Sequence, residues 1–150
     1  MLFVTPVGPL TLGYIENNLR CHFGDACVDQ EPSKKLAKQL RLYLDGKQID
    51  WFEVDTPDGP PFAKCCWNAC REIPYGETIS YKDLATRAGS PLASRAAGQA
   101  MRNNPMTILT PCHRVVSSSG KLHGYTGTTN SQSIQMKRKN YLLTLEGQTL

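Results

Sequence analysis

Alternating apolar and polar residues predict short β-strands in the first part of the chain. The runs cover residues 2–4, 10–15 and 19–23, and turn-forming sequences separate them, Pro6-Val7-Gly8-Pro9 and Glu16-Asn17-Asn18. A helical pattern follows, in which Ser33 is a candidate N-cap and apolar side chains recur at helical spacing as far as Leu44. Residues 49–54 predict a further strand. We therefore expect an α+β unit built on a small antiparallel sheet and one helix.

Proline and glycine cluster at residues 56–61, and this cluster marks the expected boundary between two domains, residues 1–58 and 59–150. Beyond it the apolar positions have helical spacing. Three helices are expected, one beginning just after the boundary, one from Ser80 to Ala88, and one from Pro91 or Leu92 to about Arg102. A short turn containing Gly89 joins the last two, and such a pair is typical of a helix-turn-helix.

Length and composition describe a globular protein. The chain has 150 residues, of which 40% are hydrophobic and 20% charged, which is enough to bury a core. Its apolar runs are too short for a membrane span, and its first residues lack the basic and apolar regions of a secretory signal. We therefore expect a cytoplasmic protein, or a nuclear one if the source is a eukaryote.

Charge is distributed unevenly. Residues 1–75 carry 8 basic and 10 acidic side chains, whereas residues 76–150 carry 9 basic and 3 acidic ones, so balances of −2 and +6 give the net charge of +4. A basic half favours an anionic partner, nucleic acid first, although a solvated basic face is the common alternative. The expected third helix is rich in Ala and Gly, which suits either tight packing inside the protein or close approach to a nucleic-acid backbone, with Arg95 reaching inward.

The six cysteines raise the alternatives of disulfides, a metal site and a nucleophile. A chain of this length without a secretory signal does not need disulfides, so we expect reduced thiols. Cys21-His22 and Cys27 lack a fourth metal ligand, and we expect burial and no metal site. Three more cysteines lie on or beside an apolar helix face and are expected in the core, Cys65, Cys66 and Cys70.

The sixth cysteine, Cys112, stands beside His113 and Arg114 in the segment TPCHRVV. A thiolate is the reactive form of cysteine, and a nearby imidazole and guanidinium favour it. However, neighbouring side chains of an extended segment point to opposite faces, and an isolated Cys-His pair is more often structural than catalytic. The pair alone leaves open a catalytic nucleophile, as in a Cys-His hydrolase, and a purely structural pair.

The pentapeptide Pro111-Cys112-His113-Arg114-Val115 resembles the acceptor motif of the O6-alkylguanine-DNA alkyltransferases, the methylated-DNA–protein-cysteine methyltransferase family. The resemblance extends over residues 57–150, and Thr5-Pro6-Val7-Gly8 is compatible with it. Further matching segments occur in the family's order, namely residues 73–78 (IPYGET), Ser80-Tyr81, residues 93–96 (ASRA), Asn104-Pro105, Gly124-Tyr125, and Leu142-Leu143 with Glu146.

The resemblance implies a single-turnover DNA repair protein that transfers the alkyl group of O6-alkylguanine irreversibly to its own Cys112, with O4-alkylthymine as a further candidate substrate. His113 would act on the thiol as a base through a water, and Glu146 would orient the imidazole. Tyr81 would donate a proton or a hydrogen bond to the departing guanine. Asn104 would tie the turn beneath the recognition helix to the active-site strand. Neither a metal nor an organic cofactor is required.

The resemblance also implies how double-stranded DNA is bound. The damaged nucleotide would be flipped out from the minor groove, and Arg95 would fill the gap. Expected DNA contacts are Thr78, Ser80, Tyr81, Arg95, Ala96, Ala97, Gly98 and Arg102. Expected pocket residues are Pro111, Val115, Tyr125, Thr126 and Gly127. Lys137-Arg138-Lys139 is either a solvated charge run or a source of phosphate contacts.

In fold, the resemblance implies a ribonuclease-H-like N-terminal domain and a mainly helical, winged helix-turn-helix second domain. A monomer suffices for the chemistry. Some relatives hold a structural zinc, but Ile15 and Arg20 stand at the matching positions here. The loop after Tyr125 is longer than is usual in the family, which leaves the range of alkyl groups open. The alternative function is a non-catalytic module that binds alkylguanine DNA, and Cys112 argues against it because such modules replace the acceptor cysteine.

Overall fold

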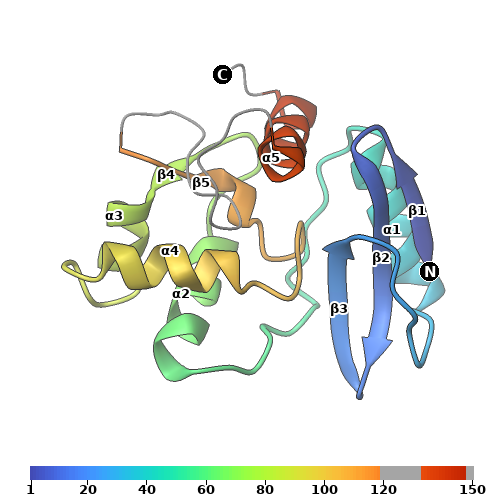
Figure 1. Ribbon diagram of the computed structural model, residues 1–150, viewed down its shortest axis with the longest axis horizontal. Helices are drawn as coiled ribbons and strands as arrows, with labels where there is room; N and C mark the ends of the chain where they lie inside the picture. Colours follow the sequence, from blue (N-terminus) through green and yellow to red (C-terminus); the bar gives the residue numbers. More distant parts are fainter. Residues whose placement is uncertain (119–132, 148–150) are drawn as a thin grey trace.

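The computed structural model describes residues 1–118 and 133–147. A small sheet with helix α1 lies on one side of the molecule, helices α2, α3 and α4 lie on the other, and α5 lies between the two groups (Figure 1). In the described part of the chain, no helix is long and apolar enough to cross a membrane.

The N-terminal sheet contains β1 (Leu2–Thr5), β2 (Gly8–Ile15) and β3 (Asn18–Phe23), in the order β1-β2-β3 with antiparallel pairing. These strands confirm the sequence prediction. Thr5 pairs with Gly8 and Ile15 with Asn18, so both connections are tight turns. The second turn places Glu16 and Asn17 at φ values of 50° and 64°, a left-handed conformation that Asn tolerates better than most residues.

Helix α1 (Lys34–Leu44) begins where the sequence predicts. The Ser33 side chain accepts a hydrogen bond from the Leu36 N–H at 3.1 Å and caps the helix. Leu40 and Tyr43 on its inner face are fully buried. The helix therefore closes one side of the sheet and brings a tyrosine hydroxyl into the interior.

The predicted strand over residues 49–54 is wrong, because this segment is irregular. Its carbonyl groups are bound by a side chain instead of a neighbouring strand. The Arg71 guanidinium donates a hydrogen bond to the Trp51 oxygen at 2.7 Å and another to the Val54 oxygen. Trp51 is buried while Phe52 is exposed, so the apolar pattern reflects one anchored side chain in a turn.

Four helices lie in the described part of the chain after residue 58, namely α2 (Pro61–Arg71), α3 (Tyr81–Arg87), α4 (Ser94–Arg102) and α5 (Ile134–Leu145). Helix α3 starts at the predicted cap, where the Ser80 side chain accepts from the Asp83 N–H at 3.0 Å. Helix α4 begins later than predicted, because a turn closed by the Ala93 N–H on the Ser90 carbonyl comes first. Two short strands, β4 (Ile79–Ser80) and β5 (Val115–Val116), pair in parallel.

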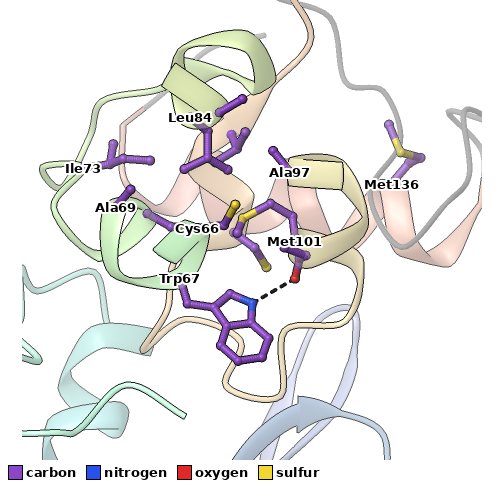
Figure 2. Close-up of a cluster of buried hydrophobic side chains, with 13 residues drawn as sticks. Cys66, Trp67, Ala69, Ile73, Leu84, Ala97, Met101 and Met136 are labelled. Atoms are coloured by element: carbon purple, nitrogen blue, oxygen red, sulfur yellow. Dashed lines mark hydrogen bonds between the residues drawn. The ribbon is translucent and has the colours of Figure 1, made fainter. Parts of the chain in front are cut away.

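The core of the second half lies between α2, α3 and α4 (Figure 2). The Trp67 indole N–H on α2 donates to the Ala100 carbonyl on α4 at 2.9 Å. Ala97 and Ala100 are buried, and their small side chains let α4 pack closely against its neighbours. The same cluster includes the acceptor candidate Cys112 and the adjacent Val115.

A second core joins the two halves of the chain. Leu10, Leu12 and Leu40 from the N-terminal unit pack in it together with apolar residues from the second half, namely Met106, Ile108, Leu109 and Leu142. Backbone bonds continue this junction, since the Cys21 N–H donates to the Pro105 carbonyl at 3.0 Å and the Thr107 N–H donates to the Cys21 carbonyl at 2.8 Å. The segment that leads to Cys112 is therefore attached to the edge of the sheet.

Candidate active site

Cys112 begins a single turn of 3-10 helix, Cys112–Arg114, directly before β5. The turn is held by the Cys112 N–H, which donates to the Thr110 carbonyl at 2.8 Å, and by the Arg114 N–H, which donates to the Pro111 carbonyl at 2.9 Å. The segment is thus coiled where it carries the motif, and it leaves the Cys112 side chain only 2% exposed. Its thiol lies in the protein interior.

His113 and Glu146 form a buried pair. The His113 Nε2 and the Glu146 Oε2 are 2.7 Å apart, and both side chains have no exposed surface. Glu146 lies at the C-cap of α5, so this helix brings the carboxylate to the Cys112 segment. Arg114 completes the arrangement with Nε on Oε1 at 2.8 Å and Nη2 on Oε2 at 2.9 Å. Its third nitrogen donates to the Ile73 carbonyl at 2.7 Å.

The charge of this group fixes the position of the histidine proton. Burial alone would raise the pKa of Glu146, but hydrogen bonds from His113 and Arg114 outweigh it and hold the pKa well below its usual range. An ionised carboxylate only accepts hydrogen bonds, so the His113 Nε2 carries the hydrogen. Burial lowers the pKa of His113, which is therefore neutral near pH 7. Its Nδ1 is a buried acceptor that has no hydrogen-bond partner among the described residues.

Tyr43 reaches the same carboxylate from α1. Its hydroxyl donates to the Glu146 Oε2 at 2.5 Å and lies 3.4 Å from the His113 Nε2. Burial, followed by the charge of Glu146, raises the pKa of Tyr43, so the phenol remains protonated and is a donor. The N-terminal unit therefore contributes a polar group to the buried His113–Glu146 pair.

Tyr81 and Lys139 lie next to one another, and both interact electrostatically with Cys112. Lys139 is fully buried, and its Nζ donates to the Val115 carbonyl at 2.7 Å and to the Tyr81 hydroxyl at 3.4 Å. Burial lowers the pKa of Lys139 to about 8 and raises that of Tyr81. The expectation of a solvated 137–139 charge run holds for Lys137 alone, because Arg138 donates to the Val7 carbonyl at 3.0 Å.

Asn104 makes two side-chain hydrogen bonds within the segment between α4 and Cys112. Its Nδ2 donates to the Thr110 carbonyl at 2.7 Å, and its Oδ1 accepts from the Met106 N–H at 2.9 Å. These bonds join the two ends of the loop between α4 and the Cys112 turn. Within that loop Ile108 has a φ of 76°, a strained value for a β-branched residue. The two hydrogen bonds of Asn104 help to hold the loop in this conformation.

Helix α4 contains five of the eight residues that were expected to contact DNA. Arg95, Ala96 and Arg102 are exposed, whereas Gly98 is half-buried, with Tyr81 as its neighbour. A Cβ atom built on Gly98 would lie 3.8 Å from the Tyr81 ring. The expected contact of Ala97 is wrong, because this side chain is fully buried in the helical core. The two remaining candidates, Thr78 and Ser80, are half-buried, and the Ser80 hydroxyl is used as the α3 cap.

The other cysteines do not compete with Cys112 as nucleophiles in this site. Burial raises the pKa of the Cys21 and Cys70 thiols far above the usual range and that of Cys66 to about 11. None of the six cysteines forms a disulfide. The expected burial is wrong for Cys27 and Cys65, which are exposed at the surface. Within residues 1–118 and 133–147, no three His, Cys, Asp or Glu side chains form a group that could hold a metal.

Comparison with known proteins assigns this arrangement to a family. The sequence model described as "6-O-methylguanine DNA methyltransferase, DNA binding domain" matches residues 61–148. The methylated-DNA–protein-cysteine methyltransferase of Methanosarcina acetivorans is 37% identical over 158 aligned residues, which cover 97% of this chain and 96% of the relative. The chain belongs to the methylated-DNA–protein-cysteine methyltransferase family.

Two solved structures bound to DNA are similar to this chain. Mycobacterium tuberculosis OGT in complex with DNA matches with a TM-score of 0.76 at 34% identity, and the match covers 97% of this chain and 91% of the other. The S. pombe protein Atl1, in complex with DNA containing O6-carboxymethylguanine, matches with a TM-score of 0.50 at 32% identity over 61% of this chain and 80% of the other.

The methyltransferase site is thus built from both predicted and unpredicted residues. Two of the expected pocket residues, Pro111 and Val115, are buried. The other three, Tyr125, Thr126 and Gly127, lie outside the described residues. Sequence reasoning missed the contribution of Tyr43, the carboxylate contacts of Arg114 and the burial of Lys139. For Arg114 the motif itself gave a signal, because an arginine between a histidine and two valines is rarely left without a partner in a core.

Proposed function

We propose that the protein repairs DNA by flipping O6-alkylguanine out of the duplex and transferring its alkyl group irreversibly to Cys112. One observation carries the proposal above the others. Cys112 is followed by a neutral His113 whose Nε2–H is held by an ionised Glu146, which leaves the buried Nδ1 as a base. Family membership and the names of the relatives support the same reaction. We keep O4-alkylthymine as a further candidate substrate.

The reaction is a displacement at the alkyl carbon. The Cys112 sulfur forms a bond to this carbon, and the bond from the carbon to guanine O6 breaks with its electron pair moving to the base. The thiol proton passes through a water to His113, and Tyr81 supplies a proton or hydrogen bond to a ring nitrogen of the leaving guanine. The raised pKa of Tyr81 supports this role, because the phenol stays protonated until the base departs. The product thioether has no good leaving group, so each protein acts once.

Lys139 adds an electrostatic contribution to this step. Its ammonium nitrogen lies 3.4 Å from the Tyr81 oxygen. A cation at this distance stabilises the phenolate that proton donation would leave. The residue therefore supports the role proposed for Tyr81, and no cofactor is needed.

Binding of double-stranded DNA through α3 and α4 follows from charge and exposure. The second half of the chain carries the net balance of +6, and Arg95 and Arg102 are exposed on α4. The matched OGT and Atl1 structures were solved with DNA. We infer that α4 lies in the minor groove, with Arg95 in the gap left by the flipped nucleotide. The opposite, small-residue face of α4 holds the helix against the core.

We also infer a division of the chain at residues 58 and 59, with a ribonuclease-H-like unit before it and a winged helix-turn-helix unit after it. The antiparallel sheet with α1 supports the first assignment, and the α3–α4 pair with the β4–β5 strands supports the second. A monomer is sufficient for the reaction. A cytoplasmic location, or a nuclear one in a eukaryote, stays a prediction.

A transfer experiment tests the proposal. Duplex DNA carrying radiolabelled O6-methylguanine is incubated with the protein, and we expect one equivalent of label on Cys112 per chain and none on a Cys112→Ala variant that still binds the DNA. Tight binding without transfer would instead support the non-catalytic module. Repeated turnover would exclude a consumed acceptor and favour a hydrolase.

A second variant tests the DNA contact. We expect Arg95→Ala to slow repair of duplex DNA strongly while leaving the reaction with a free alkylguanine base nearly unchanged, because only the duplex requires base flipping. Lys38→Ala, which removes an exposed cation from α1, is the control outside the proposed DNA-binding helices. Equal slowing with both substrates would contradict the role of Arg95.

A further inference from the structure

We propose that Tyr43 is a positioning residue of the transfer reaction: its hydroxyl shares the charge of the Glu146 Oε2 and thereby keeps His113 a neutral base. The inference rests on the proposed function. It means that the N-terminal unit takes part in the chemistry through one hydroxyl group on α1.

Three donors converge on the Glu146 Oε2. The Tyr43 hydroxyl lies at 2.5 Å, the His113 Nε2 at 2.7 Å and the Arg114 Nη2 at 2.9 Å from this oxygen. The contact with Tyr43 is the shortest of the three and has the length of a charge-assisted O–H···O⁻ bond. Tyr43 is fully buried, so water does not compete for the interaction.

Because several donors bind the Glu146 Oε2, this oxygen stabilises the protonated imidazole of His113 less than it would with His113 as its sole partner. A full negative charge on Oε2 would favour the imidazolium form of His113, and that form cannot accept a proton from the thiol. Each further donor on this oxygen withdraws part of the charge from His113. Tyr43 is well placed for this because it adds a donor without adding a charge.

The other charged groups around His113 are held by their own partners. Arg114 donates to both oxygens of Glu146 and to the Ile73 carbonyl. The positive charge of Lys139 on α5 contributes to the lowered pKa of His113. The Lys139 Nζ donates a hydrogen bond to the Val115 carbonyl at 2.7 Å. Glu146 receives in addition the Gly76 N–H at 3.3 Å. Apart from His113 itself, Tyr43 is thus the described contact of Glu146 whose removal changes the hydrogen bonding of Oε2 without removing a charge.

The test is the variant Tyr43→Phe, with Tyr75→Phe as the matched control. The Tyr75 ring packs edge-on against Tyr43 with ring centres 6.1 Å apart, but its hydroxyl faces the Gly46 and Leu145 carbonyls at 3.4 Å. For Tyr43→Phe we expect the acid limb of the transfer rate to move up by about one pH unit. The rate on that limb falls up to about tenfold and recovers at higher pH. Tyr75→Phe should keep the wild-type profile.

A measurement independent of alkyl transfer separates this proposal from the proposed function. Ring nitrogens of His113 are followed by NMR in protein labelled with 15N-histidine, and their signals are assigned by their loss in His113→Gln. We expect His113 to titrate at higher pH in Tyr43→Phe than in the wild type, whether or not the wild type transfers an alkyl group. If the wild type fails to label Cys112 but the titration moves as stated, the reaction is wrong and the hydrogen-bond account stands.

A second substitution guards against a variant that does not fold. Site-specific 3-fluorotyrosine at position 43 keeps the ring and makes the hydroxyl a stronger donor, so both the acid limb and the His113 titration should move to lower pH. Unchanged titration of His113 in both variants would overturn the proposal. A Tyr43→Phe rate lowered by one factor at every pH would also overturn it, because that is the result of a purely structural role.

Discussion

Glu146→Gln removes the charge on which the buried group depends while keeping the side-chain volume. In the reaction, His113 would become an imidazolium in a site that also contains Arg114 and Lys139, with no counter-charge left. The glutamine amide would also face the nitrogens of His113 and Arg114 with a donor group. We expect the transfer rate to fall about a thousandfold, which corresponds to ~4 kcal/mol in the barrier. Single-turnover transfer of label from O6-methylguanine DNA measures this rate.

The same variant should be markedly less stable. Arg114 is only 5% exposed, and the loss of its carboxylate partner leaves a buried charge without compensation. Such losses amount to about 3–5 kcal/mol, a large share of the stability of a small protein. Urea unfolding provides the measurement, and transfer is assayed at a temperature where the variant is folded. Glu72→Gln, at the exposed end of α2, is the control. A folded Glu146→Gln protein with the wild-type rate would refute the role of the carboxylate.

Three further predictions concern residues around this group. Asn104→Ala should lower the free energy of unfolding by about 1–3 kcal/mol in urea titration and slow transfer without weakening DNA binding, because the loop to Cys112 loses its bridge. Lys139→Met should slow transfer at unchanged DNA affinity, since Tyr81 loses its cation; unaltered single-turnover rates would contradict this. Because the pKa of His113 is lowered by burial, the unfolded chain binds more protons below pH 6.5, so stability falls as pH drops through this range. Thermal unfolding should show a shallower fall for His113→Gln.

Local patterns predicted the regular elements of this fold well. Ser33 and Ser80 both cap the helices that the sequence places after them, and the pairing of the first three strands follows from turns that the sequence also contains. These features depend on residues a few positions apart. Short-range hydrogen bonds and alternating burial are sufficient to specify them.

Contacts between distant residues could not be predicted in this way. The strand expected at residues 49–54 is absent because Arg71 binds its carbonyls, and nothing in the sequence around either segment indicates that contact. Lys139 lies in a basic run that is typical of a solvated surface. In the structure it is buried, and its Nζ donates hydrogen bonds to the Val115 carbonyl and the Tyr81 hydroxyl. Tyr43 has helical spacing with Leu36 and Leu40 and therefore looks like an ordinary apolar core residue.

The position of Tyr43 changes how the two parts of the chain relate to the chemistry. A division into a supporting N-terminal unit and a reacting second unit agrees with the position of the exposed arginines of α4, which belong to the second unit. It does not account for the buried His113–Glu146 pair, which the Tyr43 hydroxyl reaches from α1; the Tyr43 ring packs there against Trp51 of the same unit and against Tyr75 of the second unit. These rings keep water from a carboxylate and an arginine that would otherwise be hydrated, and charges interact more strongly in such surroundings. The N-terminal unit therefore contributes to the proposed reaction by excluding water from Glu146 and by supplying it with one hydrogen bond.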